Sequence, residues 1–422
     1  MKNKKEKASS SPELLEKPIF SDRKNVVRLI VFIVAFAVAV GSITFGISRI
    51  IHKDPGLYEI TVDTISDLPF YASGIRLNYY FDGSSNEIKA HLATVKSIYT
   101  SALKQSYQWF DAENTYLETA NLAQINQETG TPVKLHEDLF DILQDALERN
   151  NRSESYSIFA SPLLNLSKDL LYANNPVPVD PENEEGTRIL MEKLEQVIFD
   201  HPGTLLLNED DLTATLTLSE EYQALIEEYG LEDYGVLNLG VLADAYRLSY
   251  IAKMLETRGY TRGYLTTDSG LTLLLSSYES NAAYCLYSLE EDGTVVLSAT
   301  KATSFGNAAC AFRIFALSAE NESGFYSFEK GKKTLYRNPY QIAFPDEQPL
   351  LSALVLAKGN EIVDATYTCV CLMAAKDGSA ALEIAKSSGL DWIMDLNDGE
   401  AKLYLSNAQG VETVARYQTI LP

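Results

Sequence analysis

The spacing of hydrophobic residues changes several times along this chain of 422 residues and predicts both helices and strands. Residues 74–81, GIRLNYYF, alternate between apolar and polar positions, which is typical of a strand. Residues 137–149 instead repeat apolar side chains every three to four positions, as an amphipathic helix does. Because helices and strands follow each other without regular alternation, the pattern indicates an α+β fold.

The rest of the chain divides in the same way. Residues 174–185, NNPVPVDPENEE, predict a loop because they are rich in Asn, Pro and Glu. A short helix is expected before residue 126, and a short extended piece at 132–135. Further helices are expected at 87–110, 186–199, 241–256, 362–376 and 382–388, and strands at 203–207, 212–218, 264–267, 271–275, 283–287, 295–299, 351–357, 392–395, 401–404 and 414–419.

One apolar segment near the N-terminus differs from all others. Residues 29–48, LIVFIVAFAVAVGSITFGIS, contain no charged side chain and are long enough to span a bilayer as a helix. Eight basic side chains precede the segment within residues 1–28, whereas Arg49 and Lys53 are the basic residues shortly after it. The positive-inside rule therefore predicts a cytoplasmic N-terminus at the cell membrane. A cleaved signal peptide is the alternative interpretation.

This segment sets the expected organisation of the chain. The single-pass anchor separates a short tail from one large domain that is extracytoplasmic. The expected parts are a cytoplasmic tail at 1–28, a transmembrane signal anchor at 29–48, a linker at 49–68 and an extracytoplasmic domain at 69–422.

Charge and cysteine content exclude several functions. The formal net charge is −23, although residues 1–28 carry more basic than acidic side chains, so the large domain is strongly acidic. Nucleic acid repels such a domain and is excluded as a partner. The four cysteines and four histidines lack the spacing of a zinc site. Free thiols are expected, and a disulfide between distant cysteines stays open.

The helix predicted at 362–376 holds the best candidate for chemistry, because one acid lies within an apolar sequence. Asp364 and Thr368 are four residues apart and share one face of the helix. A carboxylate and a hydroxyl placed in this way suit a hard cation such as Mg²⁺. The alternative is structural, with Asp364 as a helix cap and Thr368 bonded back to a carbonyl of the preceding turn.

Three segments, in this order, match motifs of one family. Residues 114–126, NTYLETANLAQIN, are similar to S-T-Y-x-x-x-S-x-L-S-x-x-N, and residues 237–246, LNLGVLADAY, are similar to L-D-L-G-G-I-A-K-G-Y. Residues 363–368, VDATYT, match A-D-A-x-x-T except at the first position. The chain thus resembles the FAD:protein FMN transferase family, the ApbE-like proteins once called thiamine-biosynthesis lipoproteins. The resemblance covers roughly residues 70–405.

The resemblance implies a T-fold-like mixed domain and a specific reaction. Such proteins move FMN from FAD onto a Thr or Ser of an extracytoplasmic acceptor protein and release AMP. Mg²⁺ neutralises the pyrophosphate in this reaction. By resemblance, Asp364 and Thr368 are metal ligands, and the backbone carbonyl of Val241 completes the set. The implied positions for contact with the flavin nucleotide are Tyr116, Ser157, Asn238 and Asp244.

The chain also departs from the family at several of these positions. Ser157 and Asn238 stand where the family has aspartates, and Val241 replaces the second glycine of L-G-G. Residues 335–342, LYRNPYQI, lack the His, the Asp and the Thr-Gly of H-x-x-D-P-x-T-G. Two alternatives to the transferase therefore stay open: a catalytically degenerate homologue that binds flavin or a protein, and an extracytoplasmic binding module without any link to flavin.

Overall fold

A computed structural model describes ten segments of the chain. They are residues 53–62, 74–278, 283–302, 307–317, 322, 324–341, 344, 348–359, 361–414 and 416–421. The chain divides into two compact units, of which the first comprises residues 1–55 and 82–89 and the second residues 56–81 and 90–422.

The first unit contains the start of helix α2 (Ser85–Phe110), which continues into the second unit. The Glu87 carboxylate accepts hydrogen bonds from the backbone N–H and the hydroxyl of Ser84, each at 2.7 Å. These two hydrogen bonds satisfy polar groups at the start of the helix that would otherwise lack partners.

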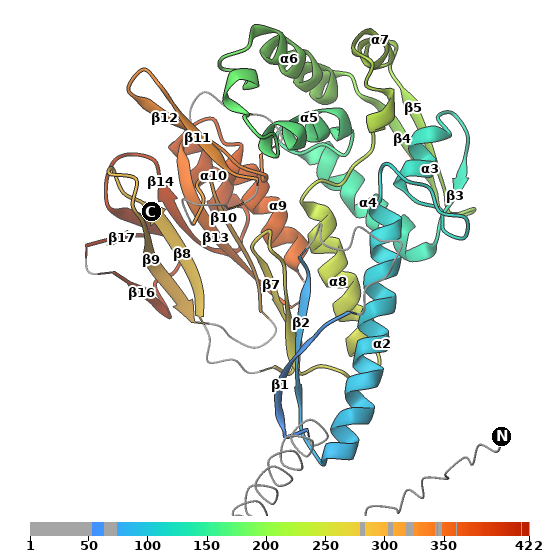
Figure 1. The fold of residues 1–422 in the computed structure, drawn as a ribbon, viewed down its shortest axis with the longest axis vertical. Coiled ribbons are helices and arrows are strands. Elements are labelled where there is room, and N and C mark those ends of the chain that lie inside the picture. Colours follow the sequence, from blue (N-terminus) through green and yellow to red (C-terminus); the bar gives the residue numbers. More distant parts are fainter. Residues whose placement is uncertain are drawn as a thin grey trace, which may run out of the picture. The chain divides into compact units, whose positions relative to one another are not determined.

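A nine-stranded sheet forms the centre of the second unit (Figure 1). Its strand order is β1-β2-β6-β7-β10-β13-β14-β15-β17, and only the β15–β17 pair is parallel. The strands are β1 (Gly56–Ile60), β2 (Arg76–Phe81), β6 (Gly263–Thr266), β7 (Leu271–Leu274), β10 (Asn307–Arg313), β13 (Leu350–Lys358), β14 (Asp391–Leu396), β15 (Lys402–Leu405) and β17 (Gln418–Ile420).

Different layers cover the two faces of this sheet. Helices α8 (Leu242–Glu256), α9 (Ile362–Met373) and α10 (Gly378–Ser387) lie on one face, with α9 against β10 and β13 (Figure 1). A three-stranded sheet, β16-β9-β8, packs on the other face, and its core includes Leu354, Leu356 and Ile393. Its strands are β8 (Ala283–Leu289), β9 (Val295–Ala302) and β16 (Val411–Thr413). The middle of the large sheet is thus buried on both sides.

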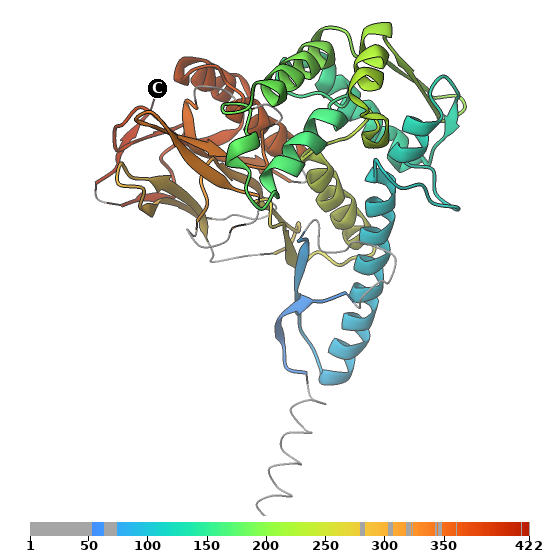
Figure 2. The ribbon, with the colours of Figure 1, turned by 45° about the horizontal axis from the view of Figure 1, so that its top comes forward.

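The remaining elements form a helical region, a three-stranded sheet of order β3-β5-β4 and a separate β11–β12 hairpin. Helices α5, α6 and α7 follow one another in contact, and Figure 2 shows them in green. The bounds are α3 (Leu122–Gln127), β3 (Val133–Lys134), α4 (Glu137–Arg152), α5 (Ser161–Leu171), η2 (Val177–Val179), α6 (Glu185–Asp200), β4 (Gly203–Asn208), β5 (Thr213–Leu218), α7 (Glu220–Tyr229), η3 (Glu232–Tyr234), β11 (Tyr326–Lys330) and β12 (Lys333–Arg337).

The α+β prediction is confirmed, and most predicted elements occur within a few residues of their expected bounds. Helix α5 was not predicted, because the buried polar residues Ser161, Asn165 and Ser167 interrupt its apolar pattern. The strand predicted at 414–419 is wrong as placed, since β16 ends at Thr413 and β17 begins at Gln418. All four cysteines are free thiols, as expected.

The predicted membrane anchor at 29–48 lies outside the described residues, as do the tail and much of the linker. Within the part of the chain that the structure describes, no helix has the length and apolar character needed to cross a bilayer.

Candidate functional site

The predicted metal ligand Asp364 forms an ion pair with an arginine. Nη1 of Arg149 lies 2.8 Å from Oδ1 of Asp364. Arg149 is in the last turns of α4, and Asp364 is in the first turn of α9. The Asp364 side chain is 46% exposed and that of Arg149 is 16% exposed. A fixed positive charge therefore stands beside the carboxylate that the sequence assigned to Mg²⁺.

A second carboxylate holds Arg149 in this position. Asp145, one turn earlier on α4, accepts from Nε of Arg149 at 2.9 Å and from Nη2 at 3.1 Å. The Tyr246 hydroxyl of α8 donates to the same Asp145 carboxylate at 2.6 Å. Two-point contact fixes the plane of a guanidinium group, and its remaining nitrogen then points to Asp364.

Aromatic side chains complete this cluster of Asp145, Arg149, Tyr246 and Asp364. The Arg149 guanidinium carbon lies 5.4 Å from the ring centroid of Tyr367, whose hydroxyl donates to the Arg149 carbonyl at 3.3 Å. Burial lowers the pKa of Arg149, but the hydrogen bonds with Asp145 and Asp364 outweigh it and raise the pKa. Burial raises the pKa of Tyr246, and the charges of neighbouring groups, mainly Tyr156 and Asp145, raise it further. The cluster thus keeps its arginine charged and its tyrosine neutral.

The other predicted ligand, Thr368, lies on α9 as expected and is buried. The structural alternative for this pair differs from the structure in its details. Glu361, not Asp364, is the N-cap residue of α9, and its side chain makes no capping bond. The hydroxyl that bonds back to the helix belongs to Thr366, which donates to the Ile362 carbonyl at 2.8 Å.

Val241, the third predicted ligand, begins helix α8 in an ordinary right-handed conformation, with φ −65° and ψ −21°. A β-branched residue costs little in this conformation, whereas Gly240 before it has φ +56° and needs glycine. The Val241 carbonyl accepts from the Asp244 backbone N–H at 3.2 Å. The turn before α8 therefore needs glycine only at Gly240, although the family motif has two glycines there.

Two predicted flavin contacts lie on neighbouring backbone segments. The Asn238 N–H donates to the Ile158 carbonyl at 2.8 Å, which places Ser157 near Asn238. Both side chains bind local backbone: Asn238 Oδ1 accepts from the Gly240 N–H at 2.8 Å, and Ser157 Oγ accepts from the Phe159 N–H at 3.2 Å. Their polar groups stabilise turns in this structure.

Asp244 is enclosed by its own partners. Its two carboxylate oxygens bind Nη1 of Arg247 and the Ser269 hydroxyl, each at 2.8 Å. Its side chain is 14% exposed and that of Arg247 is 11% exposed. Burial raises the pKa of Asp244, and the charge of Arg247 opposes that effect. A second arginine thus neutralises a second predicted site residue.

Tyr116 lies on the segment that follows α2. Its hydroxyl donates to Oδ2 of Asp111 at 2.7 Å, beyond the end of α2. Burial and this hydrogen bond raise the pKa of Tyr116. Within the described residues, Tyr116 makes no hydrogen bond to Asp244, but its neighbour Tyr107 has its ring centroid 5.6 Å from the guanidinium carbon of Arg247, the partner of Asp244.

These contacts decide whether the residues fit Mg²⁺ and FAD. One oxygen of Asp364 already binds a cation, and like charges repel a divalent ion beside it. The described residues contain no group of three or more His, Cys, Asp or Glu side chains that could hold a metal, and a set of one carboxylate, one hydroxyl and one backbone carbonyl is of a different kind. The predicted flavin contacts are also committed to internal partners. The residues do not fit a Mg²⁺–FAD site in this arrangement.

Sequence reasoning missed Arg149 and Asp145, which control this region. Their spacing of four residues on a predicted helix indicates a local ion pair, and this pair is present. No sequence pattern connects Arg149 with Asp364, because the two residues belong to different elements that meet only in the folded domain.

A comparison with solved structures gives evidence on the fold of this chain. No protein-family profile and no curated protein matches the chain. The ApbE protein of Thermotoga maritima aligns with a TM-score of 0.53 at 13% identity, over 85% of this chain and 97% of that chain. Flavin transferase ApbE from Vibrio cholerae gives 0.49 at 13% identity, over 85% and 97%. The Thermotoga comparison shows an ApbE-like fold, which confirms the expected fold.

Proposed function

We propose that this chain is an ApbE-fold protein that acts as a binding module and no longer transfers FMN. The ion pair between Arg149 and Asp364, at 2.8 Å, is the observation that carries the proposal. The arginine supplies from within the chain the positive charge that the family obtains from Mg²⁺. A metal ion has open coordination positions through which it binds and polarises pyrophosphate oxygens. An arginine has no such positions and cannot act in this way.

Three further observations support this proposal. Asn238 lacks the charge of the family's aspartate, and its side chain stabilises a turn. Asp244 is neutralised by Arg247. Ser157 is buried and binds the backbone next to it. A flavin nucleotide would have to replace internal hydrogen bonds at each of these positions, and each replacement costs free energy.

The apolar run at 29–48 supports a location at the cell membrane, with the module on the extracytoplasmic side. The acidic character of the large domain favours partners that carry positive charge.

The second candidate is an anchored FAD:protein FMN transferase with Mg²⁺ that modifies a Thr or Ser of an extracytoplasmic acceptor. The ApbE-like fold favours it, as does the half-exposed carboxylate of Asp364. This candidate requires Arg149 to leave Asp364 when metal and FAD bind.

Metal binding separates the two candidates without knowledge of the acceptor. The full-length protein in detergent is titrated with Mn²⁺, a spectroscopic probe for Mg²⁺, and free Mn²⁺ is measured by electron paramagnetic resonance. In the wild-type protein we expect no Mn²⁺ site that is lost in the Asp364→Ala variant. Arg149→Ala is expected to create such a site, and Arg152→Ala, which removes an exposed arginine of the same helix, is not.

A catalytic assay completes the test. The protein is incubated with FAD and Mg²⁺, and AMP is measured by liquid chromatography. We expect no AMP above the level of the Asp364→Ala variant. If wild-type protein binds Mn²⁺ through Asp364 and also releases AMP, the proposal is wrong and the transferase is correct.

A further inference from the structure

Two pockets adjoin each other far from the cluster around Asp364. The first has a volume of about 870 Å³ and the second of about 780 Å³. Both are lined by residues 289–292, at the turn between β8 and β9, and by Thr334 and Tyr336 of β12. Volumes of this size are typical of sites for small molecules. None of the residues predicted for metal or flavin lines either pocket.

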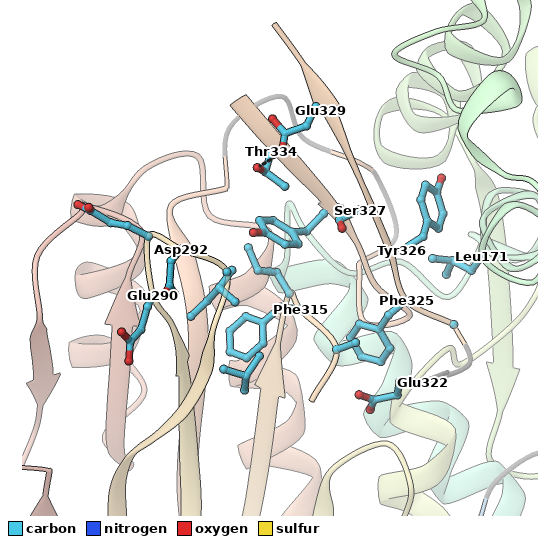
Figure 3. A pocket seen from close by; sticks show the side chains of 18 of the residues that line it. Leu171, Glu290, Asp292, Phe315, Glu322, Phe325, Tyr326, Ser327, Glu329 and Thr334 are labelled. Atoms are coloured by element: carbon cyan, nitrogen blue, oxygen red, sulfur yellow. Dashed lines mark hydrogen bonds between the residues drawn. The ribbon is translucent and has the colours of Figure 1, made fainter. Parts of the chain in front are cut away.

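The first pocket combines acids with aromatic rings. Its lining contains five acidic and five aromatic residues and no Lys, Arg or His. Figure 3 shows Glu290 and Asp292 on the β8–β9 side and Phe315 and Phe325 farther along the pocket. Carboxylates and the faces of aromatic rings both attract organic cations.

The acids of this lining differ in their partners. Glu290 forms an ion pair with Arg416, and Glu322 forms one with Arg313. Glu291 and Asp292 form no ion pair with any residue that the structure describes, and both are exposed. Arg416, which pairs with Glu290, is the nearby cation whose charge also acts on Asp292, so the three acids of the shared wall outnumber the arginine beside them.

A buried carboxyl in the second pocket provides an independent observation. Asp395 of β14 lines this pocket and is only 2% exposed. It forms no ion pair with any described residue, whereas Asp391, on the same face of the strand, pairs with Lys301 at 2.8 Å. A buried acid without a cation is costly, and a ligand's ammonium group can supply the missing charge.

Basic residues of the second pocket do not fill this role. Arg416 is engaged by Glu290, and Lys333, which also lines the pocket, belongs to the β11–β12 hairpin. The attraction for cations thus extends from Asp395 along the shared wall into the aromatic pocket.

We infer that these adjoining pockets form a binding site for an aliphatic polyamine. One ammonium group lies beside Asp395, and a second lies near Glu291 and Asp292 with its methylene chain against the aromatic rings. Two pockets that share an acidic wall suit a flexible chain with separated charges better than a compact monovalent cation. This inference does not depend on whether the domain transfers FMN.

Isothermal titration calorimetry of the full-length protein in detergent tests the inference, with spermidine as the probe at 0.15 M salt. This ionic strength screens exposed charges and suppresses non-specific attraction to the acidic surface. We expect one saturable site. Glu291→Gln with Asp292→Asn is expected to weaken binding at least tenfold, and Asp395→Asn at least fivefold.

A matched control separates the site from general charge. Glu220→Gln with Glu221→Gln removes the same charge from the first turn of α7, which lines neither pocket. We expect unchanged affinity in this variant. Equal weakening by both double variants, or binding of Mg²⁺ as tight as that of spermidine, overturns the inference.

Two further measurements complete the design. Tyr336→Ala is expected to weaken spermidine binding at least threefold, since the ring lines both pockets. A lysine-rich peptide that binds more than tenfold tighter than spermidine, with the same sensitivity to Asp395→Asn, would overturn the small polyamine in favour of a protein partner. Circular dichroism checks that each variant is folded.

Discussion

Two arginines of this domain neutralise carboxylates in opposite surroundings. Arg337 and Asp180 have no exposed side-chain surface, and Nε lies 2.9 Å from Oδ2. Arg149 instead pairs with Asp145 and Asp364, whose side chains are 41% and 46% exposed. Water screens the second cluster and not the first. The buried pair is therefore expected to contribute more to stability than the exposed cluster.

The buried pair joins two parts of the second unit. Asp180 follows η2, and Arg337 ends β12. The Tyr326 hydroxyl of β11 also donates to Asp180, at 2.7 Å. The Arg337 guanidinium lies near the rings of Phe328 and Phe344, and its Nη1 has no hydrogen-bond partner among the described residues. Arg337 falls within the segment that replaces the family's H-x-x-D-P-x-T-G motif. Its role here is structural because it is fully buried against Asp180.

Loss of the buried arginine is expected to give the largest effect. Arg337→Met keeps the volume but leaves the Asp180 carboxylate buried without a counterion. Removal of one partner from such a pair costs about 3–5 kcal/mol. Urea unfolding followed by circular dichroism measures the change. Arg337→Met with Asp180→Asn should recover part of the loss, and a cost below about 1 kcal/mol for the single variant contradicts this account.

Asp395 extends the comparison to a buried acid without an arginine. Burial raises its pKa from 3.8 to about 7, the nearby Ser288 hydroxyl opposes this, and the charge of Asp398 adds to it. The folded state then holds a proton that the unfolded state has released between about pH 4 and pH 7. The contribution of Asp395 to stability should therefore be most favourable below pH 4 and become less favourable as the pH rises to about 7, by about 4 kcal/mol at most.

Asp395→Asn should remove this dependence and stabilise the protein at pH 8 by about 2 kcal/mol, less than the upper bound because the amide is also buried. Urea unfolding at pH 5 and pH 8 measures the effect. Asp391→Asn is the control, since it removes the partner of Lys301 and is expected to destabilise. A stability loss in Asp395→Asn at pH 8 would show that the carboxylate has a stabilising partner.

Substitutions in the exposed cluster should change the stability of the protein only slightly. Arg149→Ala removes contacts with two carboxylates that are largely open to solvent, and we expect a loss of about 1 kcal/mol. Arg152→Ala, whose side chain is 74% exposed, should change stability by less than about 0.5 kcal/mol. Thermal unfolding of both variants checks the difference. A loss for Arg149→Ala as large as that for Arg337→Met would remove the distinction between the two clusters.

The smallest change is expected within the exposed cluster itself. Asp364→Asn leaves Arg149 bound to Asp145 and should cost less than about 0.5 kcal/mol. Asp145→Asn loses the charge that accepts bonds from both Arg149 and Tyr246, so its cost should be larger, about 1 kcal/mol. Chemical unfolding of the two variants in parallel gives their order. The reverse order would identify Asp364 as the main partner of Arg149.

Much of the architecture could be predicted because it depends on local pattern. The period of apolar residues in α4, α8 and α9 and the alternation in β2 place these elements near their observed bounds. The ordered motifs also indicated the ApbE-like fold that the Thermotoga structure supports. Local rules failed at α5, where polar residues are buried because of partners elsewhere, as in the bond from Ser161 to the Tyr234 carbonyl.

Asp364 and Thr368 could be placed on one helix of a mixed α+β domain from the amino-acid sequence, since helical periodicity is a property of neighbouring residues. The contacts of Asp364, by contrast, follow from how distant elements pack. Packing of α4 beside α9 brings Arg149 to its carboxylate, and packing of β12 beside the loop after η2 brings Arg337 to Asp180. Charges act over a few ångströms through space, so contacts between distant segments determine whether an acid binds a metal or an arginine.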